Sequence, residues 1–197
     1  EYLPVERLDE DIRLMKAAGI NVVRIAESTW STYEPRDGEF DFSSVLTVLE
    51  RMHANQIAVI IGTPTYALPA WLAKKHPSVM ATTPQGVNKY GPRQKMDITS
   101  PVYLRYAERI IRQLLQATAQ HPAVIGFQVD NETKDYDSCG EHVQRGFIQE
   151  LKQRFKGDLQ QLHAAFGLDY WSNRIDVWEE FLPLDSPINA SPCSTSA

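Results

Sequence analysis

The sequence predicts an α/β fold of repeated strand–helix units with parallel strands. Short, β-branched and nearly apolar runs predict strands at residues 21–25, 57–61 and 123–129, and segments with helical spacing of apolar residues lie between them. Neither GxGxxG nor GxxxxGK[ST] follows any of these strands. Both an open doubly wound sheet and a piece of an eight-stranded barrel fit the alternation. The missing phosphate-binding motifs favour the barrel.

The first unit begins with a helix and ends in a strand. Leu8, Ile12 and Met15 recur at helical spacing, and Gly19 followed by an apolar residue is typical of a helix that ends at glycine. Residues 21–25 are then nearly all apolar, as expected for a parallel strand covered on both faces.

The second unit repeats this order. Residues 45–52 carry an apolar helical stripe, and we expect Asn55 to end that helix in the left-handed conformation before the strand at 57–61. When Gly19 is aligned with Asn55, Val23 and Val59 take equivalent places in successive units.

The third unit contains a long connection. A Pro- and Gly-rich stretch runs from Gly62 to about residue 100 before helical spacing resumes at residues 104–114, and we expect His121 and Pro122 to end that helix. Long loops in compact domains are usually functional or mobile. Because this one leaves the carboxyl end of a strand, we expect it to form a wall of the site.

Helical patterns dominate the sequence beyond residue 132. Residues 143–155 and 159–166 carry apolar stripes, the second followed by Gly167, and predict a helical extension. The Ser- and Pro-rich residues 185–197 lack periodicity, so we expect an irregular, poorly ordered or foreign tail after one domain portion at residues 1–184. A complete barrel takes about 250 residues and eight strands, so three strands predict a partial barrel whose first strand would precede Tyr2.

Composition narrows the possible partners and cofactors. The 197 residues are 43% hydrophobic, enough for a core, and a net charge of −5 without a dense Lys/Arg run predicts no nucleic-acid or membrane partner. Cys139 and Cys193 lack a CxxC spacing, and the amino terminus lacks signal-peptide features, so a reducing cytoplasm is the simplest setting. The histidines show no HExxH or similar ligand spacing, and we predict neither a metal nor a cofactor.

The end of the third strand carries the strongest signal for a site. Asn131 and Glu132 directly follow an apolar run, and in barrels the residues at the carboxyl ends of strands face the reaction site. Asp and Asn are also ordinary turn residues, so a turn that merely meets solvent stays an alternative.

Several segments, in their order and spacing, resemble the amino-terminal part of family-42 glycoside hydrolases, the bacterial β-galactosidases built on a (β/α)8 TIM barrel. The resemblance covers about residues 5–184 and implies barrel strands 2 to 4 with their helices. The matching segments are residues 11–21, 23–27, 30–31, 34–35, 62–65, 69–72 and 128–132.

The resemblance implies roles for particular residues. Glu132 matches the general acid/base, Asn131 the neighbouring amide that binds the sugar, and Arg93 a substrate-binding arginine that would otherwise be read as a solvated loop residue. Retaining glycosidases use two carboxyl groups about 5–5.5 Å apart. We expect a nucleophile carboxylate or an apolar wall to raise the pKa of Glu132 so that it can donate a proton. The family's nucleophile glutamate lies on a later strand, beyond residue 197, so we expect this segment alone to be inactive.

Other residues allow two readings. Glu27 could line the cleft or pair with Arg24 or another barrel arginine, and several aromatic side chains could stack on sugars or pack in the core. Some family members bind zinc through a cysteine cluster. Here Asp97 stands where the first ligand would be and Cys139 is the only cysteine near the others, so the resemblance implies no zinc. The aromatic residues in question are Trp30, Tyr66, Trp71 and Tyr90, whereas Trp171 and Trp178 are expected in the core.

The function implied is cleavage of terminal galactose from β-galactosides, with a possible homo-oligomeric assembly because relatives are often oligomeric. One alternative is another retaining glycosidase with the same barrel, such as a β-glucanase, xylanase or β-mannosidase. The other is a non-catalytic sugar-binding or assembly piece.

Overall fold

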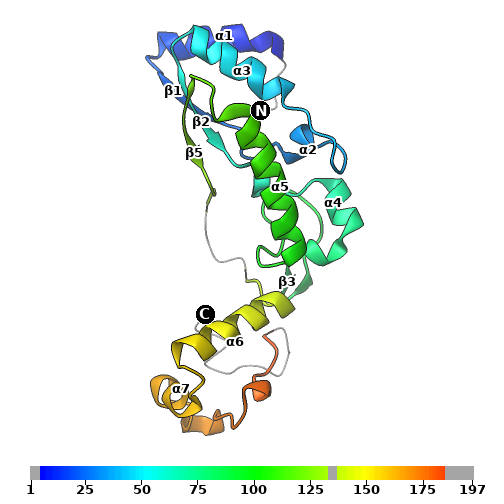
Figure 1. The fold of residues 1–197 in the computed structure, drawn as a ribbon, viewed down its shortest axis with the longest axis vertical. Coiled ribbons are helices and arrows are strands. Elements are labelled where there is room, and N and C mark those ends of the chain that lie inside the picture. The colour runs from blue at the N-terminus through cyan, green and yellow to red at the C-terminus, as the bar shows by residue number, and fades with distance from the viewer. Residues whose placement is uncertain (1–4, 133–136, 185–197) are drawn as a thin grey trace. The chain divides into compact units, whose positions relative to one another are not determined.

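The structure, a computed structural model, describes residues 5–132 and 137–184 and divides them into two compact units. The first unit comprises residues 5–79, 90–96 and 101–132, and the second residues 80–89, 97–100 and 137–184 (Figure 1). The expected tail at residues 185–197 lies outside the described residues.

A parallel sheet forms the centre of the first unit. Its strands β1 (Val22–Ile25), β2 (Ala58–Gly62) and β5 (Val124–Gln128) lie side by side in the order β1-β2-β5 (Figure 1). This order follows the sequence, as in a barrel, whereas a doubly wound sheet reverses direction at a switch point. Val23 pairs with Val59, which confirms the alignment of the two units.

The pairing of β2 with β5 contains an irregularity. Val59 pairs with Val124, but the next residue, Ile60, pairs with Gly126, so Ile125 is extra on β5. After this shift the strands continue in register, and Gly62 pairs with Gln128.

The helices of the first unit connect these strands. α1 (Leu8–Ala17) precedes β1, α3 (Ser43–Ala54) joins β1 to β2, and α5 (Pro101–Thr118) joins β2 to β5. Gly19 has φ +74° after α1, as predicted. The prediction for Asn55 was wrong: its φ is −105°, and Gln56 takes the left-handed conformation at φ 59°. The Asn55 side chain instead donates to the carbonyl of Arg51 at 2.9 Å, which satisfies a last-turn acceptor and delays the reversal by one residue. α5 likewise ends earlier than predicted, at Thr118.

The helices cover one face of the sheet. Val59 and Ile61 are fully buried, and Val23 and Ile25 share that face, whereas Val22 on the opposite face is 42% exposed. The expectation that the strand at residues 21–25 is covered on both faces was therefore wrong for the described residues. Right-handed crossovers between consecutive parallel strands place every connecting helix on the same side, which leaves the other side to different parts of a chain.

The long connection after β2 contains short elements. 3₁₀ turns at Pro64–Tyr66 and Pro77–Val79 flank α4 (Ala70–Lys75) in the first unit, and β3 (Thr82–Thr83) and β4 (Gly86–Val87) form an antiparallel pair in the second. This stretch therefore has structure of its own.

A buried carboxylate organises the loop after β1, which contains the short helix α2 (Trp30–Tyr33). The Glu34 side chain is fully buried; it accepts from Trp30 Nε1 at 2.9 Å and from Gly38 N at 2.9 Å, and forms an ion pair with Arg109 of α5. Trp71 of α4 donates to the Glu34 carbonyl at 2.8 Å. The network therefore fastens two strand-to-helix loops to α5.

The second unit is helical and confirms the predicted extension. α6 (Glu141–Arg154) and α7 (Leu159–Phe166) are followed by 3₁₀ turns at Tyr170–Ser172 and Trp178–Glu180. Asp158 caps α7 by accepting from Gln160 N at 2.8 Å, and Gly167 ends it at φ +64°. The buried core consists of Leu151, Leu162 and Leu168, with Phe147, Phe155, Leu159, Ile175, Trp178 and Phe181 packed against it.

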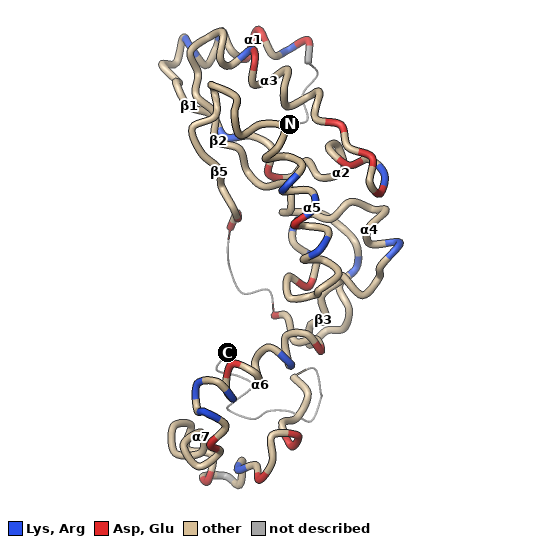
Figure 2. The backbone as a smooth tube through the Cα atoms, viewed as in Figure 1, with Lys and Arg blue, Asp and Glu red and all other residues tan. Residues whose placement is uncertain are grey.

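Charged residues of both signs are interspersed along α1, α5 and α6 (Figure 2). Many form exposed pairs within one helix, such as Arg112 with Glu108 at 2.7 Å. Within the described ranges, no helix combines the length and the apolar character that a membrane crossing requires.

Candidate active site

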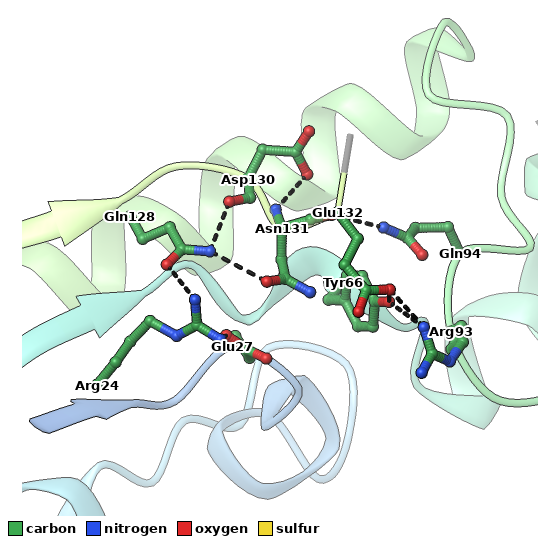
Figure 3. Close-up of polar contacts among 9 residues, drawn as sticks. All are labelled: Arg24, Glu27, Tyr66, Arg93, Gln94, Gln128, Asp130, Asn131 and Glu132. Carbon is green, nitrogen blue, oxygen red and sulfur yellow. Dashed lines mark hydrogen bonds and ion pairs between the residues drawn. The ribbon is translucent and has the colours of Figure 1, made fainter. Parts of the chain in front are cut away.

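Polar side chains from three strand ends converge at one edge of the sheet in the first unit (Figure 3). Arg24 and Glu27 belong to the end of β1, Tyr66 follows β2, and Asn131 and Glu132 follow β5. The carboxyl ends of parallel strands meet at the same edge, which explains how residues far apart in sequence come together.

Glu132 meets two donors. Tyr66 Oη donates to Glu132 Oε2 at 2.7 Å, and Arg93 forms an ion pair with the same oxygen. Arg93 Nη1 also donates to Tyr66 Oη at 3.0 Å, which closes a three-member cluster (Figure 3). The side chains of Glu132 and Arg93 are 50% and 61% exposed, so the cluster is open to a ligand. The structure thus brings together two of the residues that the sequence singled out.

Charge and hydrogen bonding couple the three members of this cluster. The negative charge of Glu132 raises the pKa of Arg93, and the hydrogen bond to Glu132 raises the pKa of Tyr66, so both neighbours keep their protons at neutral pH. Both contacts favour a negative carboxylate, because one neighbour is a cation and the other a hydroxyl donor. The expectation that an apolar wall or a second carboxylate raises the pKa of Glu132 stays a prediction.

The backbone is strained at the site. Glu132 has φ 48°, Arg93 φ 65° and the buried Ala26 φ 85°. Left-handed conformations are uncommon for residues other than glycine and cluster at active sites and ligand clamps. Their presence at both partners of the ion pair favours a functional reading of this edge.

The loop that carries Asn131 is held on several sides. Asn131 N donates to Asp130 Oδ1 at 2.8 Å, and the Asn131 carbonyl accepts from Gln94 Nε2 at 3.0 Å. The side-chain oxygen of Asn131 accepts from Gln128 Nε2 at 3.2 Å. Sequence reasoning assigned no role to Gln94 or Gln128. Gln128 could have been noticed because it is the last residue of β5, whereas Gln94 carried no signal beyond its place after Arg93.

Both readings of Glu27 hold. It forms an ion pair with Arg24 at 2.8 Å, and it lines a small cavity together with Tyr66 and Asn131. Gly62 permits this arrangement, because a Cβ atom there would lie 2.8 Å from the Cβ of Glu27.

The aromatic residues separate into different roles. Trp30 is fully buried, so it belongs to the core and cannot stack on a sugar. Trp71 is partly buried and donates to the carbonyl of Glu34, Tyr66 joins the Glu132 cluster, and Tyr90 is 54% exposed. In the second unit Trp178 packs against the apolar cluster, as expected, while the side chain of Trp171 lies outside the described part.

The candidate metal ligands are otherwise engaged. Buried Asp97 accepts from Thr99 N at 2.8 Å and from Thr99 Oγ1 at 2.5 Å. The Cys139 thiol is buried and lies 3.6 Å from the carbonyl of Thr82. Across residues 5–132 and 137–184, no three His, Cys, Asp or Glu side chains gather as a metal site.

A larger cavity lies on the side of the sheet that the helices cover. Its volume is about 550 Å³, and residues of α1, β1 and α3 such as Met15, Ile25 and Val48 line it. It is largely apolar, and although Asp11 and Arg24 are among its lining residues, Glu132 and Arg93 are not, so we place the candidate site at the strand ends.

Known proteins resemble this chain in sequence and in fold. A family model described as β-galactosidase, glycosyl hydrolase family 42, matches residues 1–194. The chain belongs to glycoside hydrolase family 42. A β-galactosidase of an Arthrobacter species is 35% identical to this family-42 chain over 187 residues, which cover 93% of the chain and 27% of that protein. A β-galactosidase of Heyndrickxia coagulans is 33% identical over 188 residues, 93% of the chain and 28% of its own length.

Solved structures agree with the family. The cold-adapted β-galactosidase of Rahnella sp. R3 matches with a TM-score of 0.86 at 33% identity, covering 92% of the family-42 chain and 26% of the other. The β-galactosidase of Halorubrum lacusprofundi matches with a TM-score of 0.87 at 29% identity, covering 98% and 29%. The expected α/β fold, a partial (β/α)8 barrel, is therefore confirmed. The chain spans about a quarter of the length of the relatives it matches.

Proposed function

We propose that this chain supplies the proton-transfer half of a retaining β-galactosidase site, with Glu132 as general acid/base and Asn131 and Arg93 binding the sugar. The observation that carries the proposal is the placement of Glu132 after β5, bonded by Tyr66 and Arg93 and next to Asn131. The relatives named β-galactosidases support the substrate class.

The chemistry assigns Glu132 two successive steps. It gives a proton to the glycosidic oxygen as the bond to the sugar breaks, while a second carboxylate bonds to the anomeric carbon. Glu132 then takes a proton from the water that releases the galactose. The resemblance implies that a later strand of the barrel supplies the second carboxylate.

The neighbours of Glu132 have a part in this cycle. Arg93 and Tyr66 stabilise the ionised form, which is the form that must accept a proton from water in the second step. For the first step Glu132 must hold a proton, so Arg93 has to turn away from it. A guanidinium with five donors can then bond sugar hydroxyls instead.

The pairing of Glu132 with Arg93 also favours a second candidate function for the chain by itself. A carboxylate held ionised by a guanidinium binds hydroxyl groups but does not protonate a leaving group. The 197-residue chain would then bind galactosides without cleaving them, and no turnover of a nitrophenyl β-galactoside is expected from it.

The test uses leaving groups that differ in basicity, in the enzyme that carries this chain within a complete barrel. E132Q should slow hydrolysis of lactose by about 10²–10⁴-fold, the range of general acid catalysis. Release of dinitrophenol needs no proton, so glycosylation by the dinitrophenyl galactoside should fall far less. The exposed E108Q on α5 makes the same charge change and should leave both rates unaltered. Equal losses for the two substrates in E132Q would refute the assignment.

We also propose that the protein works in a reducing compartment such as the cytoplasm, since its sequence has only two cysteines and no CxxC spacing.

A further inference from the structure

A chain of one-way hydrogen bonds begins at Arg24 on β1. Its Nη1 atom donates to Gln128 Oε1 across the sheet at 2.7 Å (Figure 3). A guanidinium carries donors only. The oxygen of the Gln128 amide must therefore face Arg24, and its nitrogen must face the other way.

A second one-way partner fixes the same amide independently. Gln128 Nε2 donates to the backbone carbonyl of Asp130 at 2.7 Å, and a carbonyl can only accept. Amide oxygen and nitrogen atoms are otherwise hard to tell apart by shape. With a pure donor on one side and a pure acceptor on the other, the Gln128 amide has one possible orientation.

The orientation of the Gln128 amide determines that of the Asn131 amide. Gln128 Nε2 lies 3.2 Å from Asn131 Oδ1 and needs an acceptor there, so the Asn131 nitrogen must point away, toward Tyr66 and Glu132 (Figure 3). A hydrogen bond from the Asn131 side chain lowers the pKa of Tyr66, in opposition to the larger effect of Glu132, as expected for an NH₂ group facing that hydroxyl.

Arg24, the first residue of this series of hydrogen bonds, is itself held in place. Glu27 forms an ion pair with Arg24 at 2.8 Å, and the Glu27 side chain is only 22% exposed. Because Gly62 leaves room for Glu27, the acid lies close against β2 and restrains the guanidinium. Arg24 is therefore placed to hold the Gln128 amide in one orientation.

We propose that Arg24 and Gln128 are positioning residues that lock the Asn131 side chain as a hydrogen-bond donor toward the ligand. The inference rests on the proposed function in one respect, that Asn131 contacts the sugar. The sugar group that meets Asn131 must then act as an acceptor, so the site favours a hydroxyl or fluorine there. Replacing Gln128 by Glu would remove the donor, and the Asn131 amide would turn its nitrogen to the new carboxylate and present its oxygen to the ligand.

The first arm of the test uses no ligand and measures the relay, by which we mean the hydrogen bonds from Arg24 to Gln128 and from Gln128 to Asn131. In the ¹⁵N-labelled 197-residue chain, the side-chain NH₂ signals of Gln128 are those that disappear in Q128E. Their hydrogen exchange should be about 10-fold slower than that of exposed Gln116 on α5, as expected for one hydrogen bond. R24M should abolish this protection and shift the Asn131 side-chain signals, which N131D identifies. Q116E is the matched control and should shift neither.

The second arm measures whether Asn131 donates or accepts the hydrogen bond to the ligand. It uses two neutral sugars, methyl β-D-galactopyranoside and its 2-deoxy-2-fluoro analogue. Fluorine accepts a hydrogen bond but cannot donate one. The ratio of the fluoro Kd to the hydroxyl Kd should rise about 10-fold in Q128E relative to the parent chain and Q116E, the effect of one hydrogen bond. Using a ratio within each variant cancels any general loss of affinity.

The outcomes separate the two proposals. Unprotected Gln128 signals, or Asn131 signals that ignore R24M, would overturn the relay. An unchanged Kd ratio in Q128E would overturn the polarity of Asn131. If the relay signals are present but neither sugar binds the parent chain or a complete barrel containing it, the proposed function fails while the orientation of the two amides stands.

Discussion

Replacing Glu34 by Gln tests the buried charge that ties the first loop to α5. The side chains have the same shape, but the amide carries no charge for Arg109 and keeps only one oxygen for the donors of Trp30 and Gly38. The change therefore removes an ion pair and one acceptor from a fully buried site.

The magnitude follows from the surroundings. Breaking a buried ion pair by removing one partner costs about 3–5 kcal/mol. Here the Arg109 side chain is 33% exposed and keeps a second partner, Asp37, at 2.7 Å, so part of the charge stays compensated. We expect E34Q to lower the free energy of unfolding by about 2–3 kcal/mol.

Urea denaturation followed by tryptophan fluorescence measures this loss, which should shift the midpoint by about 1 M. The matched control is E39Q, whose exposed pair with Arg36 at 2.9 Å should contribute less than about 0.5 kcal/mol. If E34Q unfolds at the same urea concentration as E39Q, the buried charge does not stabilise the loop and the reasoning is refuted.

Three further predictions concern single sites. Gly62→Ala should lower the free energy of unfolding by about 1–3 kcal/mol, because its Cβ would lie 2.8 Å from the Cβ of Glu27. Gly126→Ala on β5 is the control and should be tolerated, because no atom lies within 4 Å of its Cβ. Equal urea midpoints for the two variants would contradict this prediction. His163→Leu should raise the free energy of unfolding by about 1 kcal/mol, because the 2% exposed imidazole has no hydrogen-bond partner for either ring nitrogen in the described chain; a lower thermal midpoint would show that it has one. Burial raises the pKa of Tyr103 to about 12, so the folded state should lose stability as the pH rises from 10 toward 12, where only the unfolded chain ionises this group. Absorbance at 295 nm should show a late titration step that Tyr103→Phe removes. Simultaneous titration of all tyrosines near pH 10 would contradict this prediction.

Much of the fold could be read from local patterns. The strands β1, β2 and β5 and the helices α1, α3 and α5 lie where apolar periodicity predicts them, because each element buries one face. The end of α3 could not be read, since whether Asn55 turns or bonds back to Arg51 depends on a small difference in local energies. The open face of the sheet was also missed, because coverage depends on chain segments outside the pattern of any single strand.

The site was predictable in part for a similar reason. Glu132, Asn131 and Arg93 stand in a recognisable order, and the structure brings Glu132 and Arg93 into contact. Tyr66 as the second donor to Glu132, and Gln128 as the link between Arg24 and Asn131, depend on which side chains face each other across strands. Sequence spacing alone does not contain that information.

The extra residue in β5 decides which way the site points. Side chains alternate along a strand, so Gln128 shares a face with Arg24 only because Ile125 advances the pairing by one position. Were Ile125 paired opposite Ile60 in a regular ladder, Gln128 would shift by one position and project among the helices, and the guanidinium would lose the oxygen it now holds. A single unpaired position midway along a strand thus decides which face of the sheet carries Gln128.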